Sequence, residues 1–286
     1  LRVSGYDPLD TYLFAIGPAV SNDACANAPP IGEGVFTGDT TAATADGSPG
    51  NWPDIWFRYT AGFSGRVSID TLGSSIDTSH AIYDPDLNGC PGDNSDLLAL
   101  AEDCGGAPQS CNSLAVTAGE QYLVRVGGLG AAGPVRLQIQ AAGALTGTVT
   151  QAATGLPFSE PGAVEIRVYN EFDPGYFNPP AVGSALNDSN GQFTVSGLRP
   201  GSYTAVGEAA GFVGEVYANL SGGDVDPSDG TAIPVLAGST TPGVDFSLDT
   251  GGRVAGRVVD AATGLPILAT VELFGSNEGM AAYGST

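Results

Sequence analysis

Apolar and polar residues alternate along most of this chain, in short runs that are separated by turn-forming residues. The run Arg-Val-Ser-Ile-Asp at 66–70 and the run Val-Arg-Leu-Gln-Ile at 135–139 are typical. Because successive side chains on a β-strand point to opposite faces, each run offers one face to a core and the other to solvent. Clusters of Gly, Pro, Asn and Asp, as at 46–51 and 187–191, separate the runs. This pattern predicts an all-β protein built of β-sandwiches.

Part of the chain is repeated. The sequence Gly-Thr-Val-Thr-Gln-Ala-Ala-Thr-Gly-Leu-Pro at 147–157 returns as Gly-Arg-Val-Val-Asp-Ala-Ala-Thr-Gly-Leu-Pro at 256–266, an offset of 109 residues. Such an offset is too long for a solenoid repeat and indicates a duplicated domain. The second copy has room for two strands, which we expect at 253–260 and 269–274.

The length of 286 residues suits two domains and part of a third. Glycines at 143 and at 251–252 mark the expected borders. We therefore predict tandem β-sandwiches with four parts: an N-terminal extension (1–21), a first sandwich (22–141), a second sandwich (142–249) and a partial second copy of that sandwich (250–286).

The motifs of the first predicted domain are Asn-Asp-Ala-Cys-Ala-Asn-Ala at 22–28, Asp-Ile-Trp-Phe-Arg-Tyr-Thr at 54–60, Ser-Gly-Arg-Val-Ser-Ile-Asp at 64–70, Gly-Ser-Ser-Ile-Asp-Thr at 73–78 and Gly-Glu-Gln-Tyr-Leu-Val-Arg-Val-Gly at 119–127. Residues 22–141 thereby resemble the pre-peptidase C-terminal (PPC)-like jelly-roll domains of secreted bacterial proteins.

The motifs of the later part are Gly147 to Pro157, Asp-Ser-Asn-Gly at 188–191, Gly-Leu-Arg-Pro-Gly-Ser-Tyr at 197–203, Gly211-Phe212 and Gly-Val-Asp-Phe-Ser-Leu at 243–248. Residues 142–249 and 250–286 resemble carboxypeptidase regulatory-like domains, which form a transthyretin- or immunoglobulin-like sandwich. Both resemblances imply non-catalytic modules of proteases, adhesins and large surface proteins, and hence an extracellular location.

The chain has four cysteines, which are Cys25, Cys90, Cys104 and Cys111. An even number of cysteines, without a C-x-x-C motif and without a neighbouring histidine, indicates disulfides rather than zinc. Of the three pairings that four cysteines allow, we expect Cys90–Cys104 with Cys25–Cys111. The reason is that Cys90 and Cys104 flank a short strand at 97–101 that returns toward Tyr83.

A calcium loop is suggested by the sequence Asp-Pro-Asp-Leu-Asn-Gly, which begins at Asp84. Oxygen-bearing side chains at alternate positions, followed by glycine at a sharp turn, are the start of such a loop. Asp84, Asp86 and Asn88 are the candidate ligands, and calcium is the one cofactor that the sequence indicates. Cys90 at the seventh position and Ser95 at the twelfth depart from the pattern, so an acidic hairpin tip is the alternative.

The composition narrows the range of partners. Asp and Glu number 31 against 9 Lys and Arg, for a net charge of −22, and every basic residue is an arginine. Scattered arginines cannot neutralise a row of phosphates or bind an anionic membrane, so nucleic acid and membrane partners are excluded. No run of 18 apolar residues predicts membrane insertion. The aromatic loop around Tyr176 and Phe177 suits either a partner chain or a glycan.

Enzymatic motifs are not found. Gly-Leu-Gly-Ala-Ala-Gly at 128–133 is followed by Pro134 and a strand instead of a helix, so it predicts a hairpin loop and not a nucleotide site. His80 is the single histidine, and its neighbour Ser79 would point to the other face of the strand. We therefore expect a half-buried strand histidine and no catalytic relay.

A strand-like segment precedes the first domain, and its apolar residues are Tyr12, Leu13, Phe14 and Ile16. We expect this segment to complete the partial copy of a neighbouring subunit by β-strand addition, which would build a filament. The alternative is a longer polypeptide with further domains at both ends.

The predicted function is that of a non-catalytic structural or adhesive protein, extracellular or at the cell surface, in a surface filament, matrix fibre or long adhesin. Its partners would be copies of itself or further domains of the same polypeptide. The alternative is a glycan- or calcium-binding accessory module of a secreted hydrolase.

Overall fold

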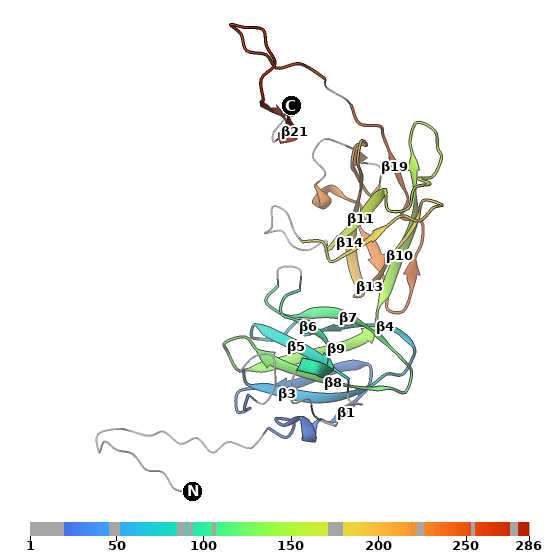
Figure 1. Cartoon of the computed structure of the whole chain (residues 1–286). Helices are drawn as coiled ribbons and strands as arrows, with labels where there is room; N and C mark the ends of the chain where they lie inside the picture. The colour runs from blue at the N-terminus through green and yellow to red at the C-terminus, as the bar shows by residue number, and fades with distance from the viewer. Residues whose placement is uncertain are drawn as a thin grey trace, which may run out of the picture.

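The computed structural model describes residues 20–45, 52–84, 90, 94–104, 107–170, 180–218, 220–221, 226–252, 255–274 and 280–285. These residues form β-strands joined by turns and by the short 3-10 helices η1 (Cys25–Asn27), η3 (Asn94–Asp96) and η4 (Pro227–Asp229). The strands build two β-sandwiches, one after the other along the chain (Figure 1). The predicted fold class, all-β with tandem sandwiches, is confirmed.

The first sandwich consists of two sheets with the core between them. One sheet has the order β1 (Pro30–Ile31), β3 (Asp54–Thr60), β8 (Gln121–Gly128), β5 (Thr78–Tyr83) and β6 (Leu97–Ala101). The other has the order β2 (Gly34–Asp39), β9 (Pro134–Ala141), β4 (Gly65–Asp70) and β7 (Cys111–Val116). Alternate residues of the strands meet in this core, among them Ile55, Val67, Ile69, Val124 and Leu137. Burial of these apolar side chains is the main source of stability.

The second sandwich is built in the same way. One sheet has the order β12 (Gly183–Leu186), β11 (Val164–Asn170), β14 (Gly201–Ala209), β15 (Glu215–Val216) and β16 (Leu220–Ser221), and β17 (Ile233–Val235) also pairs with β14. The facing sheet joins β13 (Gln192–Leu198), β10 (Gly143–Gln151) and β18 (Thr240–Thr241), and β19 (Phe246–Leu248) also pairs with β10. Phe193 and Phe246 pack against each other in its core.

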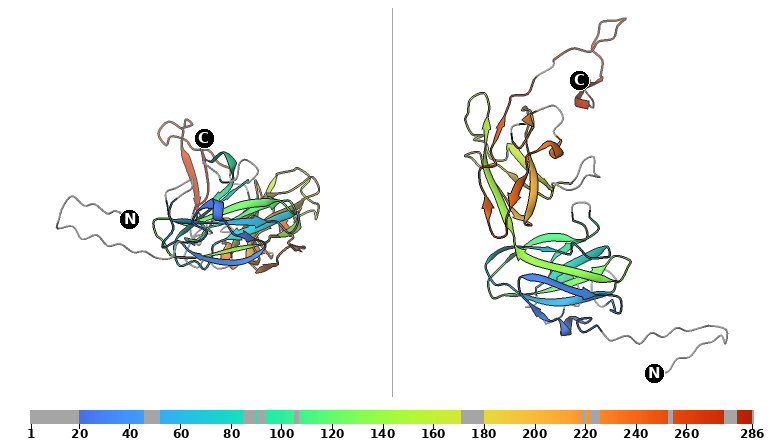
Figure 2. Two further views of the ribbon diagram at one scale, coloured as in Figure 1. Left: turned by 90° about the horizontal axis from the view of Figure 1, so that it is seen from below. Right: turned by 180° about the vertical axis from the view of Figure 1, so that it is seen from behind.

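The two sandwiches are joined by one residue. Strand β9 ends at Ala141 and β10 begins at Gly143. The Ala142 N–H donates to the Arg66 carbonyl (2.9 Å), and the Gly238 N–H donates to the Ala141 carbonyl (3.3 Å). The second sandwich consequently lies directly against the first (Figure 2).

The sequence repeat is reproduced locally in the structure. The Gln151 N–H donates to the Leu156 carbonyl, and the equivalent Asp260 N–H donates to the Leu265 carbonyl, both at 2.9 Å. Strands β20 (Thr270–Phe274) and β21 (Met280–Ser285) then form a hairpin. The expected strand at 253–260 is not formed over its described part, 255–260, apart from a single bridge at Val259. In the first copy, neighbouring strands on both sides hold this segment extended, whereas no described residue occupies those positions in the second copy.

All four cysteines form disulfides, but the expected pairing is wrong. Cys25 is bonded to Cys90, and Cys104 to Cys111, with Cα–Cα distances of 5.6 and 4.9 Å. Cys25 packs beside Tyr83 and Leu97, which flank the loop that carries Cys90. Cys104 faces Ala107 in a tight turn, and this turn returns the chain to Cys111. Neither the Cys104–Ala107 bridge nor the packing of Cys25 beside Tyr83 and Leu97 follows from the spacing of the cysteines.

Several predicted site residues lie outside the described residues. They are Asp86 and Asn88 of the calcium loop, Tyr176 and Phe177 of the aromatic loop, and Tyr12, Leu13, Phe14 and Ile16 of the N-terminal segment. Asp84 is described, and its N–H donates to the Asp96 carbonyl at 2.9 Å. The calcium site and the inter-subunit strand therefore remain predictions.

Candidate functional site: the interdomain cavity

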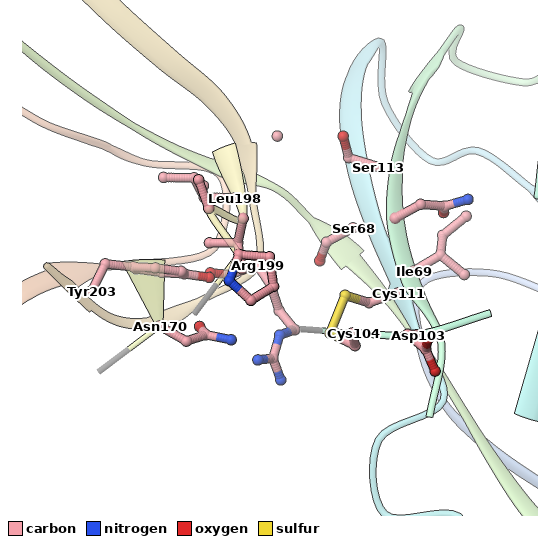
Figure 3. Close-up of a pocket in the computed structure, with 15 residues that line it drawn as sticks. Ser68, Ile69, Asp103, Cys104, Cys111, Ser113, Asn170, Leu198, Arg199 and Tyr203 are labelled. Atoms are coloured by element: carbon pink, nitrogen blue, oxygen red, sulfur yellow. A yellow bond between two sulfur atoms is a disulfide. The ribbon is translucent and has the colours of Figure 1, made fainter. Parts of the chain in front are cut away.

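A cavity of about 470 Å³ lies where the two sandwiches meet (Figure 3). The first sandwich contributes β4, the start of β7 and the Cys104–Cys111 disulfide to its wall. The second contributes Asn170 at the end of β11, residues 180–182 and the corner from Gly197 to Tyr203. Cavities of this size at domain interfaces are common places for ligands.

Alternation in β4 places polar side chains at this junction. Val67 and Ile69 point into the first core, so Ser68 and Asp70 occupy the outer face of the sheet. Both are nevertheless buried. The face of β4 that the sequence pattern assigns to solvent is therefore not exposed at Ser68 and Asp70.

Gly197 of the second sandwich lies close to the first sandwich. Its φ is +83°, a conformation that favours glycine, and a Cβ at this position would lie 2.5 Å from Ser113 Oγ and 3.0 Å from Arg66 Nε. Arg66 Nη2 in turn donates to Ser113 Oγ at 2.8 Å. A side chain at position 197 would require Ser113 and Arg66 to shift.

Asp70 is a buried carboxylate with incomplete pairing. Its Oδ1 accepts the Leu72 N–H at 3.2 Å and lies 3.8 Å from Arg136 Nη1. Its Oδ2 has no hydrogen-bond partner within the described part of the chain. Burial raises the pKa of Asp70, while the positive charges of Arg199 and Arg136 and the Leu72 N–H act in the opposite direction.

Arg199 brings a positive charge to the cavity from the second sandwich. Its carbonyl accepts the Tyr203 hydroxyl at 2.5 Å, while its guanidinium extends into the space between the sandwiches (Figure 3). Among the described residues no carboxylate lies within 4.0 Å of this guanidinium. Burial raises the pKa of the Tyr203 hydroxyl. The positive charge of Arg199 lowers this pKa, whereas the negative charge of Asp70 raises it further.

His80 lies behind the cavity wall, between the two sheets of the first sandwich, and is fully buried instead of half-buried as expected. Its Nδ1 lies 2.7 Å from Ser110 Oγ and its Nε2 lies 3.0 Å from Asn112 Oδ1. Because an amide oxygen only accepts, Nε2 carries the proton and Nδ1 accepts from the serine. Burial lowers the pKa of His80 to about 4, against the effect of the Asn112 hydrogen bond, so the ring is neutral at pH 7.

Ser110, His80 and Asn112 have the residue types of a nucleophilic triad, but the serine is not accessible from solvent. Ser110 is fully buried and its hydroxyl also bonds Thr71 Oγ1 at 2.9 Å. A substrate cannot reach it, so the cluster is a polar network of the core. Sequence reasoning considered only Ser79 and missed Ser110 and Asn112. The one feature of the sequence that could have indicated this network is the polar composition around the start of the strand at 111–116, with Ser110, Asn112 and Ser113.

A buried ion pair lies elsewhere in the first sandwich. Arg125 Nη2 is 2.9 Å from Asp54 Oδ2, across neighbouring strands β8 and β3. Both side chains are almost completely removed from water. Such a pair stabilises the fold only while both partners are present.

Within the described ranges, no group of three or more His, Cys, Asp or Glu side chains is placed to hold a metal ion. None of the described helices is long and apolar enough to cross a membrane.

Comparisons with known proteins give only similarity of architecture. No protein-family model and no curated protein matches the chain. The pre-peptidase C-terminal domain of a collagenase from Bacillus anthracis is 14% identical, with a TM-score of 0.29, over 40% of this chain and 94% of that domain. The minor pilin GBS52 of Streptococcus agalactiae is 14% identical over 66% of this chain and 87% of that one, with a TM-score of 0.28. The pilus 2b backbone protein of group B streptococcus is 10% identical over 76% of this chain and 98% of that one, with a TM-score of 0.22.

Proposed function

We propose that this chain is a non-catalytic extracellular structural protein, a subunit or segment of a surface filament, matrix fibre or long adhesin. The observation that carries the proposal is the direct succession of two β-sandwiches with a single residue between them. Domains joined in this way extend a chain by one domain length each, without a long flexible linker. This is the construction that a fibre needs.

The chemistry of the described residues supports the proposal. Two disulfides are typical of proteins that fold in an oxidising compartment, and they link loops of the first sandwich. The single histidine is neutral and buried in the core of the first sandwich. The net charge of −22 favours solubility in an exposed, repeated protein.

Exposed apolar side chains in the segment 255–274 support the proposal that this chain contacts copies of itself. In the first copy Phe158 is 5% exposed, because the rest of its sandwich covers it. Its equivalent Ile267 is 44% exposed, and the adjacent Leu268 is 88% exposed. Apolar side chains of this kind favour association with another β-protein. We propose residues 11–16 of a neighbouring copy as the strand that covers them.

Sedimentation velocity and negative-stain microscopy of the purified chain test this function. Leu268→Asp should weaken self-association, because it places a charge in the proposed contact. Leu186→Asp is the matched control, since Leu186 is 59% exposed on β12 of the second sandwich. Deletion of residues 1–20 should have the same effect as Leu268→Asp. Unchanged assembly in the deletion variant would refute strand addition by this segment.

The interdomain cavity favours a second candidate, a ligand-binding accessory module. The guanidinium of Arg199 and the amide of Asn170 both face the space between the sandwiches (Figure 3). Such groups bind the hydroxyls and carboxylates of glycans. A rise in melting temperature on adding soluble oligosaccharides, lost in Arg199→Gln, would support this candidate.

A further inference from the structure

The two copies of the sequence repeat are most alike at a turn that is exposed in both. Residues 152–157 and 261–266 both read Ala-Ala-Thr-Gly-Leu-Pro, whereas three of the four positions just before the turn differ between the copies. All six residues of the turn are exposed in each copy. Packing in a core therefore does not explain why this stretch is identical.

Backbone geometry accounts for part of the turn. Gly155 and Gly264 have φ values of +66° and +69°, which favour glycine. Their N–H groups donate to the carbonyls of Gln151 and Asp260, both at 2.8 Å. The threonine before each glycine accepts, through Oγ1, the N–H of the leucine that follows, at 3.2 and 3.4 Å. The leucine side chains take no part in these bonds, so the turn does not require a leucine.

The two leucines are exposed to the same extent in a complete and in a partial sandwich. Leu156 is 63% exposed in the second sandwich, and Leu265 is 64% exposed in the partial copy. By contrast, the apolar position two residues later is 5% exposed at Phe158 and 44% exposed at Ile267. Neighbouring strands thus cover Phe158 but leave Leu156 in solvent. Exposed leucines that the domain does not itself cover are available to another molecule.

The turn at 152–157 lies away from the first sandwich. Strand β10 begins at the junction with Gly143 and ends at Gln151, so the turn that follows lies at the opposite end of the second sandwich (Figure 1). The Ala152 N–H donates to the Leu248 carbonyl at 2.9 Å, which holds the turn beside the end of β19. The turn consequently presents its leucine at a fixed place on an accessible end.

Charge indicates which partner suits these turns. The chain carries a net charge of −22, so two copies repel each other wherever their acidic residues come close. Neither turn contains a charged residue, and the uncharged stretches to which they belong run from 137 to 159 and from 261 to 271. Contact between two like-charged copies is opposed least at such places. A second copy also carries the same pair of turns, so that two contacts form at once and strengthen each other.

We propose that the turns at 152–157 and 261–266 bind a second copy of this chain, turn against turn, through Leu156 and Leu265. This inference rests on the proposed role of the chain in self-association, but it uses residues other than Leu268 and the segment 11–16. The same surface serves on both copies, as in a symmetric contact between identical subunits.

Sedimentation velocity of the full chain over a range of concentrations tests the contact. Leu156→Asp should raise the dissociation constant of self-association about tenfold, because a charge replaces an apolar contact. Adding Leu265→Asp should raise it further. Leu186→Asp is the matched control, since Leu186 is 59% exposed on β12 of the same sandwich, and it should leave the constant unchanged. Both leucines of the turns are exposed, so these variants should keep the circular dichroism spectrum of the wild type.

A charge-pair experiment decides whether turn meets turn. The variants Leu156→Asp/Leu265→Asp and Leu156→Arg/Leu265→Arg should each associate weakly, and an equal mixture should associate more tightly than either one alone. A mixture without this recovery would overturn the contact between turns.

The same measurements separate this contact from the proposed function. Unchanged association in Leu156→Asp/Leu265→Asp, together with weakened association in Leu268→Asp, would overturn the contact and leave the proposed function standing. A wild-type chain that stays monomeric at every concentration would overturn both the contact and the proposed self-association.

Discussion

Acid should destabilise the first sandwich through His80. The ring is buried and neutral, with a pKa lowered from 6.5 to about 4. The unfolded chain binds a proton as the pH falls through 6.5, whereas the folded chain does so only near pH 4. The contribution of neutral His80 is therefore complete above pH 6.5 and is lost as the pH falls to about 4. One pKa unit is worth about 1.4 kcal/mol, so the total loss is about 3 kcal/mol.

Two measurements check this prediction. The chain has one histidine, so a single imidazole C2–H resonance reports its titration. Between pH 8 and pH 5 we expect that resonance to move by no more than about a tenth of its full titration shift. Urea unfolding of wild type and His80→Gln at several pH values isolates the energetic effect. The stability advantage of the wild type over the variant should shrink by about 1.4 kcal/mol per pH unit below 6.5.

The result that refutes the reasoning is specific. A histidine resonance that titrates near pH 6.5 in the folded protein would mean that His80 is solvated. An energy difference between wild type and His80→Gln that does not depend on pH would lead to the same conclusion. In either case the hydrogen-bonded network behind the cavity would not exist as described.

Three further predictions concern packing and covalent links. Gly197→Ala should lower the free energy of urea unfolding more than Gly211→Ala, because both have φ near +84° but only position 197 lacks space for a Cβ. Equal losses would contradict the close approach. Asp54→Ala should cost about 3–5 kcal/mol in the same assay, because it removes the carboxylate that pairs with the buried Arg125. A loss below about 1 kcal/mol would indicate a solvated pair. Peptide mapping without reduction should return the two disulfides given above, and a peptide joining the second and third cysteines would contradict them.

Local features of the fold could be predicted from the sequence, because they depend on short-range periodicity. Alternation in a run such as 66–70 indicates a strand and shows which residues enter the core. The same alternation assigns Ser68 and Asp70 to solvent, and here the prediction fails. Both are buried, and Ser68 lines the cavity between the two sandwiches.

The candidate site was not predictable, because its parts are distant in sequence. Asp70 and Arg199 come from different sandwiches, and the two motifs that contain them, at 64–70 and 197–203, give no sign that the residues lie near each other. Ser110, the partner of His80 Nδ1, is 30 residues away in the sequence, within the segment that the Cys104–Cys111 disulfide closes. The prediction of the disulfide pairing failed for the same reason, since the bonded residues Cys25 and Cys90 are 65 residues apart in the sequence.

Immunogold electron microscopy of the producing cells, with an antibody raised against residues 22–249, tests the central claim most directly. The structural proposal predicts gold particles along extended fibres or appendages outside the cell, at regular intervals if the chain is a repeated subunit. Label confined to the cell interior, or found only on dispersed protein in the medium, would contradict it.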